Sequence, residues 1–189
     1  PSGAMAGVYT LVDNTKGVWN APANVSTIGA EDLTLQINDN MQAGLNVDAV
    51  SGKSVNAIRF FNGQGILVWG ARTLDGNSQD WRYVNVRRTV TMIEQSVKLA
   101  ARIYVFAPND ANTWQTVKSM IENFLTNMWK QGALQGAVPD DAFSVSIGLG
   151  STMTGNDILD GIMRVSVRIA VVRPAEFIHI EVEQQMAKS

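Results

Sequence analysis

Two glycine-containing stretches of the sequence share part of a phosphate-binding motif. Residues 51–54 read SGKS, like the end of a P-loop, but that motif requires a glycine where Val47 stands. Residues 148–153 read GLGSTM, which begins like the dinucleotide-binding fingerprint, but Met153 takes the place of its third glycine. Ordinary turns explain both stretches. One alternative function stays open, a soluble enzyme or ligand-binding domain that holds a nucleotide or phosphate with the loop at 148–156.

Other residues that carry catalysis or bind metals are scarce. The chain has no cysteine and a single histidine, His179, for which the sequence offers no catalytic partner. Residues 75–80, DGNSQD, space their oxygen atoms like part of a calcium loop but lack its distal glutamate. Asp140 and Asp141 are adjacent, which suits a helix cap or a polar loop better than an acid–base pair. The sequence therefore predicts a protein that is not an enzyme and has no catalytic, metal-binding or cofactor-binding residues.

Three arginines are candidates for binding an anion. Arg72 follows an apolar run, and Arg87 and Arg88 are neighbours at the start of a helical pattern. A guanidinium group binds carboxylates and phosphates with two parallel hydrogen bonds. The sequence allows two interpretations, a shared anion site or salt bridges at a contact between subunits.

Composition places the chain among ordinary globular proteins. It has 189 residues, of which 46% are hydrophobic and 17% charged, and its net charge is −2. This length predicts one domain, or one domain plus a small appendage, with a proper core, and the charge favours neither nucleic acid nor an anionic membrane as the main partner. No apolar run is long enough to predict a transmembrane helix.

Hydrophobic periodicity predicts the elements that position these residues. Apolar residues recur at helical spacing over 88–106 and 112–130, and the pair Asn62-Gly63 predicts a hairpin between two apolar strands. We expect an α+β fold with a mixed, mostly antiparallel sheet flanked by the two long helices. The remaining expected elements are helices at 2–12 and 38–47, a short helix or turn at 154–161, and strands at 32–38, 57–61, 66–69, 81–86, 142–150 and 162–173.

The C-terminal stretch 175–186, AEFIHIEVEQQM, alternates with a period of two residues. Such alternation predicts a half-buried strand, and a strand at a chain end usually lies at a sheet edge, where it can pair with another chain. One face carries Phe177, His179, Glu181 and Glu183, and the other carries Ile178, Ile180 and Val182.

Several stretches, taken in order, resemble the tail sheath proteins of contractile phages and of related contractile injection systems. The most specific are VWGARTL at 68–74, YVNVRR at 83–88 and RPAEFI at 173–178. One departure is Ala107, where the family often has a glutamate before Pro-Asn. Further matching stretches lie at 2–24, 55–74, 81–97, 106–129, 132–136 and 173–186.

The resemblance implies that residues 1–189 are the C-terminal, inner domain of a longer subunit, whose outer domains lie N-terminal to it. Such a subunit polymerises helically around a tail tube and contracts to drive the tube through a target envelope. The implied partners are neighbouring sheath subunits, the tail tube protein, and baseplate and terminator proteins, with no nucleic acid and no membrane insertion. The implied location is a virion tail or injection particle assembled in the cytoplasm of the host bacterium.

The resemblance also implies sites of contact. Residues 175–189 would be an arm whose strand joins the sheet of a neighbour, and the alternative is an ordinary strand at an edge of the chain's own sheet. A tail terminator or baseplate adaptor with the same domain is a further alternative function. The implied exchange residues are Glu176, Phe177, Ile178, His179, Ile180, Glu181, Val182 and Glu183, and the candidates for facing the tube or a neighbour are Lys118, Glu122, Lys130, Arg87 and Arg88.

Overall fold

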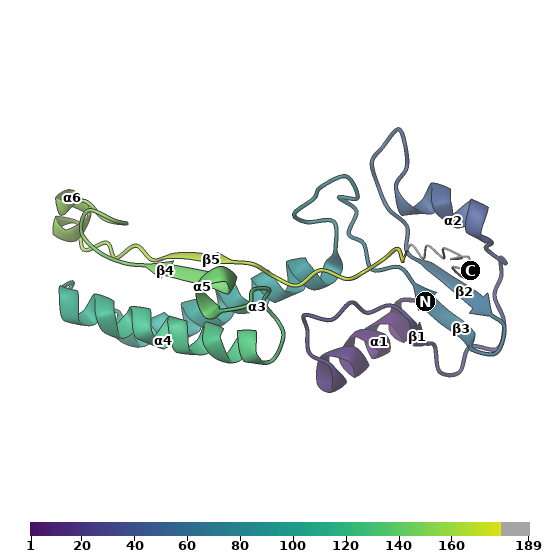
Figure 1. Cartoon of the computed structure of the whole chain (residues 1–189), viewed down its shortest axis with the longest axis horizontal. Coiled ribbons are helices and arrows are strands. Elements are labelled where there is room, and N and C mark those ends of the chain that lie inside the picture. Colours follow the sequence, from purple (N-terminus) through teal and green to yellow (C-terminus); the bar gives the residue numbers. More distant parts are fainter. Residues whose placement is uncertain (179–189) are drawn as a thin grey trace, which may run out of the picture.

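The computed structural model describes residues 1–178, which form an elongated molecule with two lobes (Figure 1). We call residues 1–83 the sheet lobe and residues 84–171 the helical lobe. The sheet lobe contains α1 (Ser2–Thr15), β1 (Val25–Ser26), α2 (Asp39–Asn46), β2 (Ala57–Phe61) and β3 (Gly65–Trp69). The helical lobe contains α3 (Val84–Ala101), the 3₁₀ turn η1 (Arg102–Tyr104), α4 (Ala111–Lys130), α5 (Pro139–Ala142), β4 (Phe143–Ser146), α6 (Gly155–Leu159) and β5 (Ser166–Ile169).

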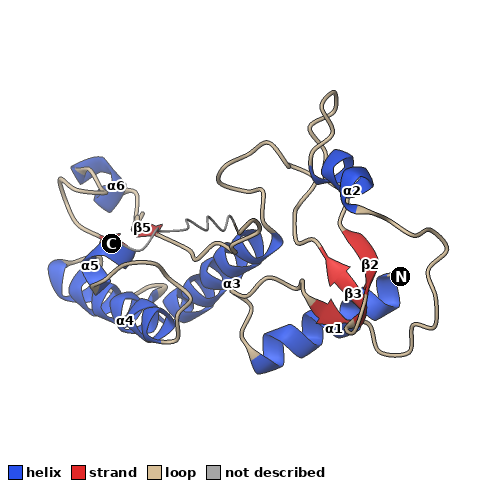
Figure 2. Cartoon of the chain, turned by 45° about the vertical axis from the view of Figure 1, so that its right-hand side comes forward, coloured by secondary structure: helices blue, strands red, loops and turns tan. Residues whose placement is uncertain are grey.

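The sheet lobe is built around the hairpin of β2 and β3. Gly63 and Gly65 both have a positive φ, which the tight turn needs and which glycine adopts without strain. β3 is the central strand, with β1 and β2 antiparallel on either side. Helix α1 packs Val8 and Val12 against Val68 on one face of this sheet, and α2 lies toward the other face (Figure 2).

The helical lobe is held together by α4. Asp110 caps this helix by accepting a hydrogen bond from the Thr113 amide. Its apolar stripe, at intervals of three and four residues, is buried against α3 and the two-stranded sheet of β4 and β5. The buried residues of the stripe are Val117, Ile121, Leu125 and Met128.

The predicted α+β class is confirmed, and so are the hairpin and both long helices. The strands within residues 1–178, however, form two separate antiparallel sheets, not one. The strand expected at 32–38 is wrong, because no other segment of residues 1–178 pairs with this stretch as a strand, and Leu35 is 58% exposed. The strand expected at 81–86 is also wrong, because α3 starts at Val84 after a single bridge between Arg72 and Tyr83.

Helix α6 has the capping box that makes so short a helix stable. Thr154 accepts a hydrogen bond from the Asp157 amide, and Asp157 accepts one from the Thr154 amide at 2.8 Å. The bond from the Thr154 amide and those from Arg164 lower the pKa of Asp157 from 3.8 to about 2.

We expect Asp157 to titrate with a midpoint near pH 2 in the folded protein. Because its pKa in the folded state lies below that in the unfolded state, its stabilising contribution is complete above about pH 4 and is lost as the pH falls toward 2. Carboxyl carbon chemical shifts measured by NMR between pH 1.5 and 6 test this. Thr154→Ala should raise the midpoint. A midpoint near 3.8, the ordinary value for aspartate, in the unsubstituted protein would contradict the prediction.

Among residues 1–178, no helix is both long and apolar enough to cross a membrane.

Candidate interaction site

The two stretches that resemble phosphate-binding loops use their backbone amides internally. In 148–153, the amides of Ser151, Thr152 and Met153 all donate to the Gly148 carbonyl. In 51–54, the Gly52 amide donates to the backbone oxygen of Asp48, whose carboxylate also accepts from the Ser51 amide. A phosphate cradle needs such amides to be free. The structure therefore supports the simpler interpretation, that both stretches are self-contained turns.

Arg72 does bind an anion, and the anion is a carboxylate of the same chain. Its Nε donates to both carboxylate oxygens of Glu176, at 2.9 and 3.0 Å, and its Nη2 donates to Oε2 at 2.6 Å. The Tyr83 hydroxyl donates to Oε2 as well, at 3.0 Å. These side chains are 104 and 93 positions from Glu176 in the sequence, so no local pattern could have paired them.

The surroundings of Arg72 fix it in place. The Asn56 side chain donates to the Arg72 carbonyl and accepts from its amide, each at 2.8 Å, as a neighbouring strand would. Nη1 of Arg72 donates to the carbonyl of Asn46 at 3.1 Å. Asn46 is the last residue of α2, where the helix dipole favours a cation.

Protonation states in this cluster follow from its contacts. The hydrogen bonds to Glu176 raise the pKa of the Arg72 guanidinium above its usual value. Burial raises the pKa of the Tyr83 phenol, and the bond to Glu176 raises it further. Arg72 is therefore charged and Tyr83 protonated at neutral pH, and both donate to the carboxylate.

Arg87 and Arg88 take part in other contacts, so the three arginines form no common anion site. Arg88 binds Asp13 of α1 through two hydrogen bonds, at 2.8 and 2.6 Å, and lies over the Tyr9 ring. Arg87 lies over the Trp81 ring, 4.9 Å from its centre. Arg88 thus joins α1 to α3, whereas Arg87 stays on the surface.

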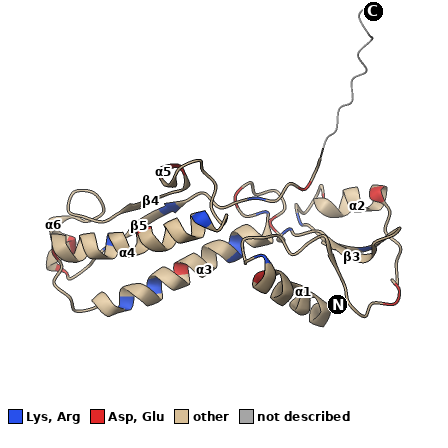
Figure 3. Ribbon diagram, turned by 60° about the horizontal axis from the view of Figure 1, so that its bottom comes forward, with Lys and Arg blue, Asp and Glu red and all other residues tan. Residues whose placement is uncertain are grey.

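The three charged candidates on α4 are accessible to a partner. Lys118 and Glu122 form a pair at 3.7 Å with both side chains 37% exposed, and Lys130 is exposed at the helix end. Figure 3 shows charges of both signs along α3 and α4, so neither helix offers a face of one sign. Their contact with a tube or a neighbour stays a prediction.

The C-terminal segment 172–178 runs from β5 to the sheet lobe without forming a strand (Figure 1). Glu176 is held by Arg72, whereas Phe177 and Ile178 are 61% and 80% exposed. The strand expected from Glu176 onward has therefore not begun by Ile178 in the single chain. The other predicted exchange residues, His179, Ile180, Glu181, Val182 and Glu183, lie outside the described residues.

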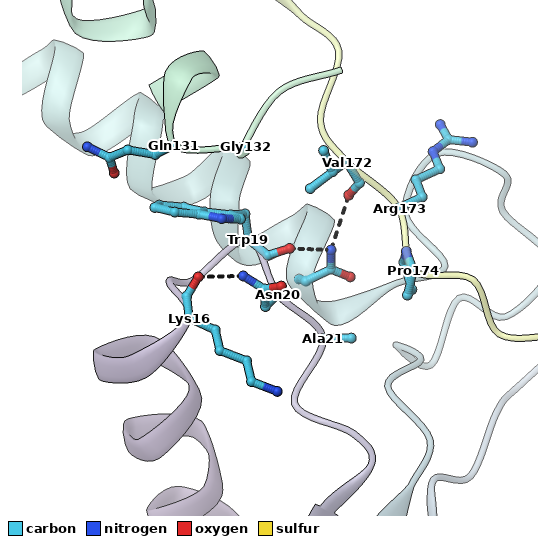
Figure 4. A pocket seen from close by; sticks show the side chains of 10 residues that line it. Lys16, Trp19, Asn20, Ala21, Gln131, Gly132, Val172, Arg173 and Pro174 are labelled. Carbon is cyan, nitrogen blue, oxygen red and sulfur yellow. Dashed lines mark hydrogen bonds between the residues drawn. The ribbon is translucent and has the colours of Figure 1, made fainter. Parts of the chain in front are cut away.

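The two lobes meet where this segment starts (Figure 4). Asn85, at the start of α3, donates from Nδ2 to the carbonyls of Trp19, at 2.8 Å, and Val172, at 3.1 Å. It is 1% exposed and ties three segments together. A hollow of about 510 Å³ opens beside it, between the end of α1 and the segment at 172–174.

The sheet of the sheet lobe has an open edge. Within residues 1–178, no backbone group of another segment pairs with the outer side of β2. Unpaired amide and carbonyl groups along such an edge can accept a further strand. Residues 173–178, which join no strand in the described part of the chain, and an open edge are thus present in one molecule.

Comparison with known proteins identifies the family. Residues 77–185, more than half of the chain, match the phage tail sheath C-terminal domain. The chain is 26% identical over 133 residues to the tail sheath protein of Vibrio phage KVP40, covering 70% of this chain and 20% of that protein.

Solved structures agree. A chain in the anti-feeding prophage (AFP) baseplate shares 42% identity with a TM-score of 0.90, covering 98% of this chain and 50% of that chain. A chain of the PVC sheath complex in the contracted state, from an extracellular contractile injection system, shares 44% identity with a TM-score of 0.90, covering 96% and 50%. The chain thus spans between a fifth and half of the length of these relatives. Matched over more than half of its length, the chain belongs to the phage tail sheath family, through the C-terminal domain of that family.

Proposed function

We propose that the protein containing this chain is a structural subunit of a contractile sheath. It polymerises helically around a tail tube and contracts to drive the tube through a target envelope. Residues 1–189 form its inner, tube-proximal domain. Support comes from the family match and from the similarity to a sheath in the contracted state.

The observation that carries this proposal is that residues 173–178 form no strand among the described residues, in a molecule whose β2 edge is open. Residues 175–189 act as an arm that adds a strand to the sheet of a neighbouring subunit. Main-chain hydrogen bonds along the β2 edge supply the affinity, which is β-augmentation. A contact of this kind joins two different surfaces, so its repetition along an axis builds a helical filament.

Contraction in this proposal needs no nucleotide. Near-rigid inner domains rearrange from a metastable extended helix into a shorter, wider one, and interface free energy drives the change while the arms keep subunits linked. The internally bonded turns at 51–54 and 148–153 are consistent with this. The tail tube, the terminator and the baseplate are its partners, in a phage tail or injection particle assembled in the bacterial cytoplasm.

Substituting Ile178 in the complete protein tests the arm. Ile178→Pro removes one backbone amide from the exchanged strand, and the proline ring hinders pairing, so we expect assembly into tubes to fail. Ile178→Ala is the matched control, because it removes the same side chain but keeps the amide, and we expect tubes to form. Negative-stain electron microscopy gives the readout.

Two outcomes would contradict the proposal. Normal tubes from Ile178→Pro would exclude strand exchange at this position. Dispersed particles or single rings from the unsubstituted complete protein, even with tube protein present, would exclude a sheath and favour a terminator or baseplate adaptor.

A further inference from the structure

We infer that Arg72 and Tyr83 form a socket for Glu176 that anchors the base of the C-terminal arm, so that the part free to exchange between subunits begins at Phe177. The role in exchange rests on the proposed function, whereas the socket itself is a feature of the single subunit. The inference assigns Glu176 to the subunit's own structure and removes it from the exchanged strand.

The geometry of the socket is specific for a carboxylate. Nε and Nη2 of the planar Arg72 guanidinium donate to Oε1 and Oε2 of Glu176, at 2.9 and 2.6 Å, and the Tyr83 hydroxyl donates to Oε2 at 3.0 Å. Arg72 is 7% exposed and the Glu176 side chain 20%. A charge-assisted pair with two parallel bonds, largely shielded from water, is among the stronger polar contacts in proteins.

Contacts outside the arm also hold Arg72 in position. The Asn56 side chain bonds to the Arg72 backbone, and the Asn46 carbonyl accepts a hydrogen bond from Nη1 of Arg72. These bonds orient the guanidinium group without the arm. Gly70 leaves room for this arrangement, since a Cβ there would lie 2.8 Å from the Asn56 side-chain oxygen. A guanidinium group that is already oriented loses little conformational entropy when it binds a carboxylate.

Contacts change sharply along the arm. Arg173 meets Asp80 at 3.5 Å with the aspartate 81% exposed, a surface pair of the kind that contributes little. Glu176 is held in the socket, and Phe177 and Ile178 then turn out to solvent. The firm attachment is therefore at Glu176, two residues before Ile178.

The position of the socket determines where a pull on the arm is transmitted. Arg72 follows β3 and is bonded to the end of α2, and Tyr83 directly precedes α3. A force applied by a neighbour beyond Phe177 therefore reaches the sheet lobe and α3 together. Without the socket, the same force would reach the rest of the subunit only through the backbone of residues 172–174.

Paired spin labels on the unassembled complete protein test the socket. The chain has no cysteine, so Phe60→Cys on β2 and Ile178→Cys, after replacement of any cysteine upstream, give two defined labels. We expect one narrow label-to-label distance. Glu176→Lys places a cation against Arg72 and should abolish that narrow peak. Asp80→Lys is the matched control, with the same charge change at the surface pair, and should keep it.

A narrow peak that survives Glu176→Lys would overturn the socket. If that variant fails to fold, Glu176→Gln and Tyr83→Phe decide by the same measurement. Both keep the side-chain shape and remove part of the hydrogen bonding, so each should broaden the distance distribution. An unchanged distribution in both would overturn the inference.

Assembly provides the second readout. Tubes made from Glu176→Gln should dissociate at lower urea concentration than tubes from Asp80→Asn, and by more than the difference between the unfolding midpoints of the two unassembled proteins. Equal dissociation would overturn the role in force transmission. If the unsubstituted protein forms no tubes, the proposed function fails, and the spin-label distances still decide whether the socket exists.

Discussion

Replacing Asn85 with aspartate is expected to destabilise the protein by at least about 3 kcal/mol at pH 7, because it leaves an unpaired buried charge. The Asn85 amide group donates to the carbonyls of Trp19 and Val172, and an ionised carboxylate would repel both. The residue is 1% exposed, so water cannot compensate. Urea denaturation followed by tryptophan fluorescence measures the loss.

The stability of the Asn85→Asp variant should decrease as the pH rises. Burial raises the pKa of the introduced carboxyl in the folded state above its unfolded value near about 4. The folded protein then binds more protons than the unfolded one, so its stability falls as the pH rises from about 4 through the raised pKa. Asn123→Asp, on the exposed face of α4, is the control and should show neither effect. A variant at Asn85 that is as stable as this control would contradict the role of Asn85 in joining the lobes.

Replacing Leu125 with alanine is expected to lower the free energy of unfolding by about 3 kcal/mol. Leu125 is 0% exposed and lies in the core of the helical lobe with Ile121 and Val117. The substitution removes buried methyl groups and leaves a cavity that helix α4, packed on β4, cannot close fully. The midpoint of urea denaturation should fall without a change in slope.

The matched control is Leu159→Ala, because Leu159 is 86% exposed. Its effect should stay within about 0.5 kcal/mol. Equal effects of the two substitutions would show that α4 is not the centre of a packed core.

Elements with complete local signals were predictable from the sequence. The stripe of α4 and its Asp110 cap fix a helix from contacts within a few residues. The turn at Asn62-Gly63 fixes the hairpin of β2 and β3 in the same way. Each of these signals involves residues that are close in sequence. It can therefore be recognised without knowing how the rest of the chain folds.

The candidate site was predictable only in part. The sequence marked Arg72 as a candidate either for an anion site shared with Arg87 and Arg88 or for a salt bridge between subunits, and the structure shows an ion pair within the chain. The identity of the partner was not predictable, since Glu176 reaches Arg72 only after β5 has carried the chain back to the sheet lobe. Tyr83 was predicted to lie in a strand, because the residues around it alternate between two faces. In the structure it forms a single bridge with Arg72, and α3 begins at the next residue.

By itself, the sequence determined the local elements, the α+β class and, through ordered motifs, the resemblance to a sheath protein. Only the tertiary structure decided that the strands of residues 1–178 form two sheets, that 32–38 joins neither of them and that Glu176 is held within the subunit. The physical reason is the range of the interactions. A cap or a tight turn is decided by neighbours along the chain, whereas strand pairing and ion pairing depend on which distant segments the fold brings into contact.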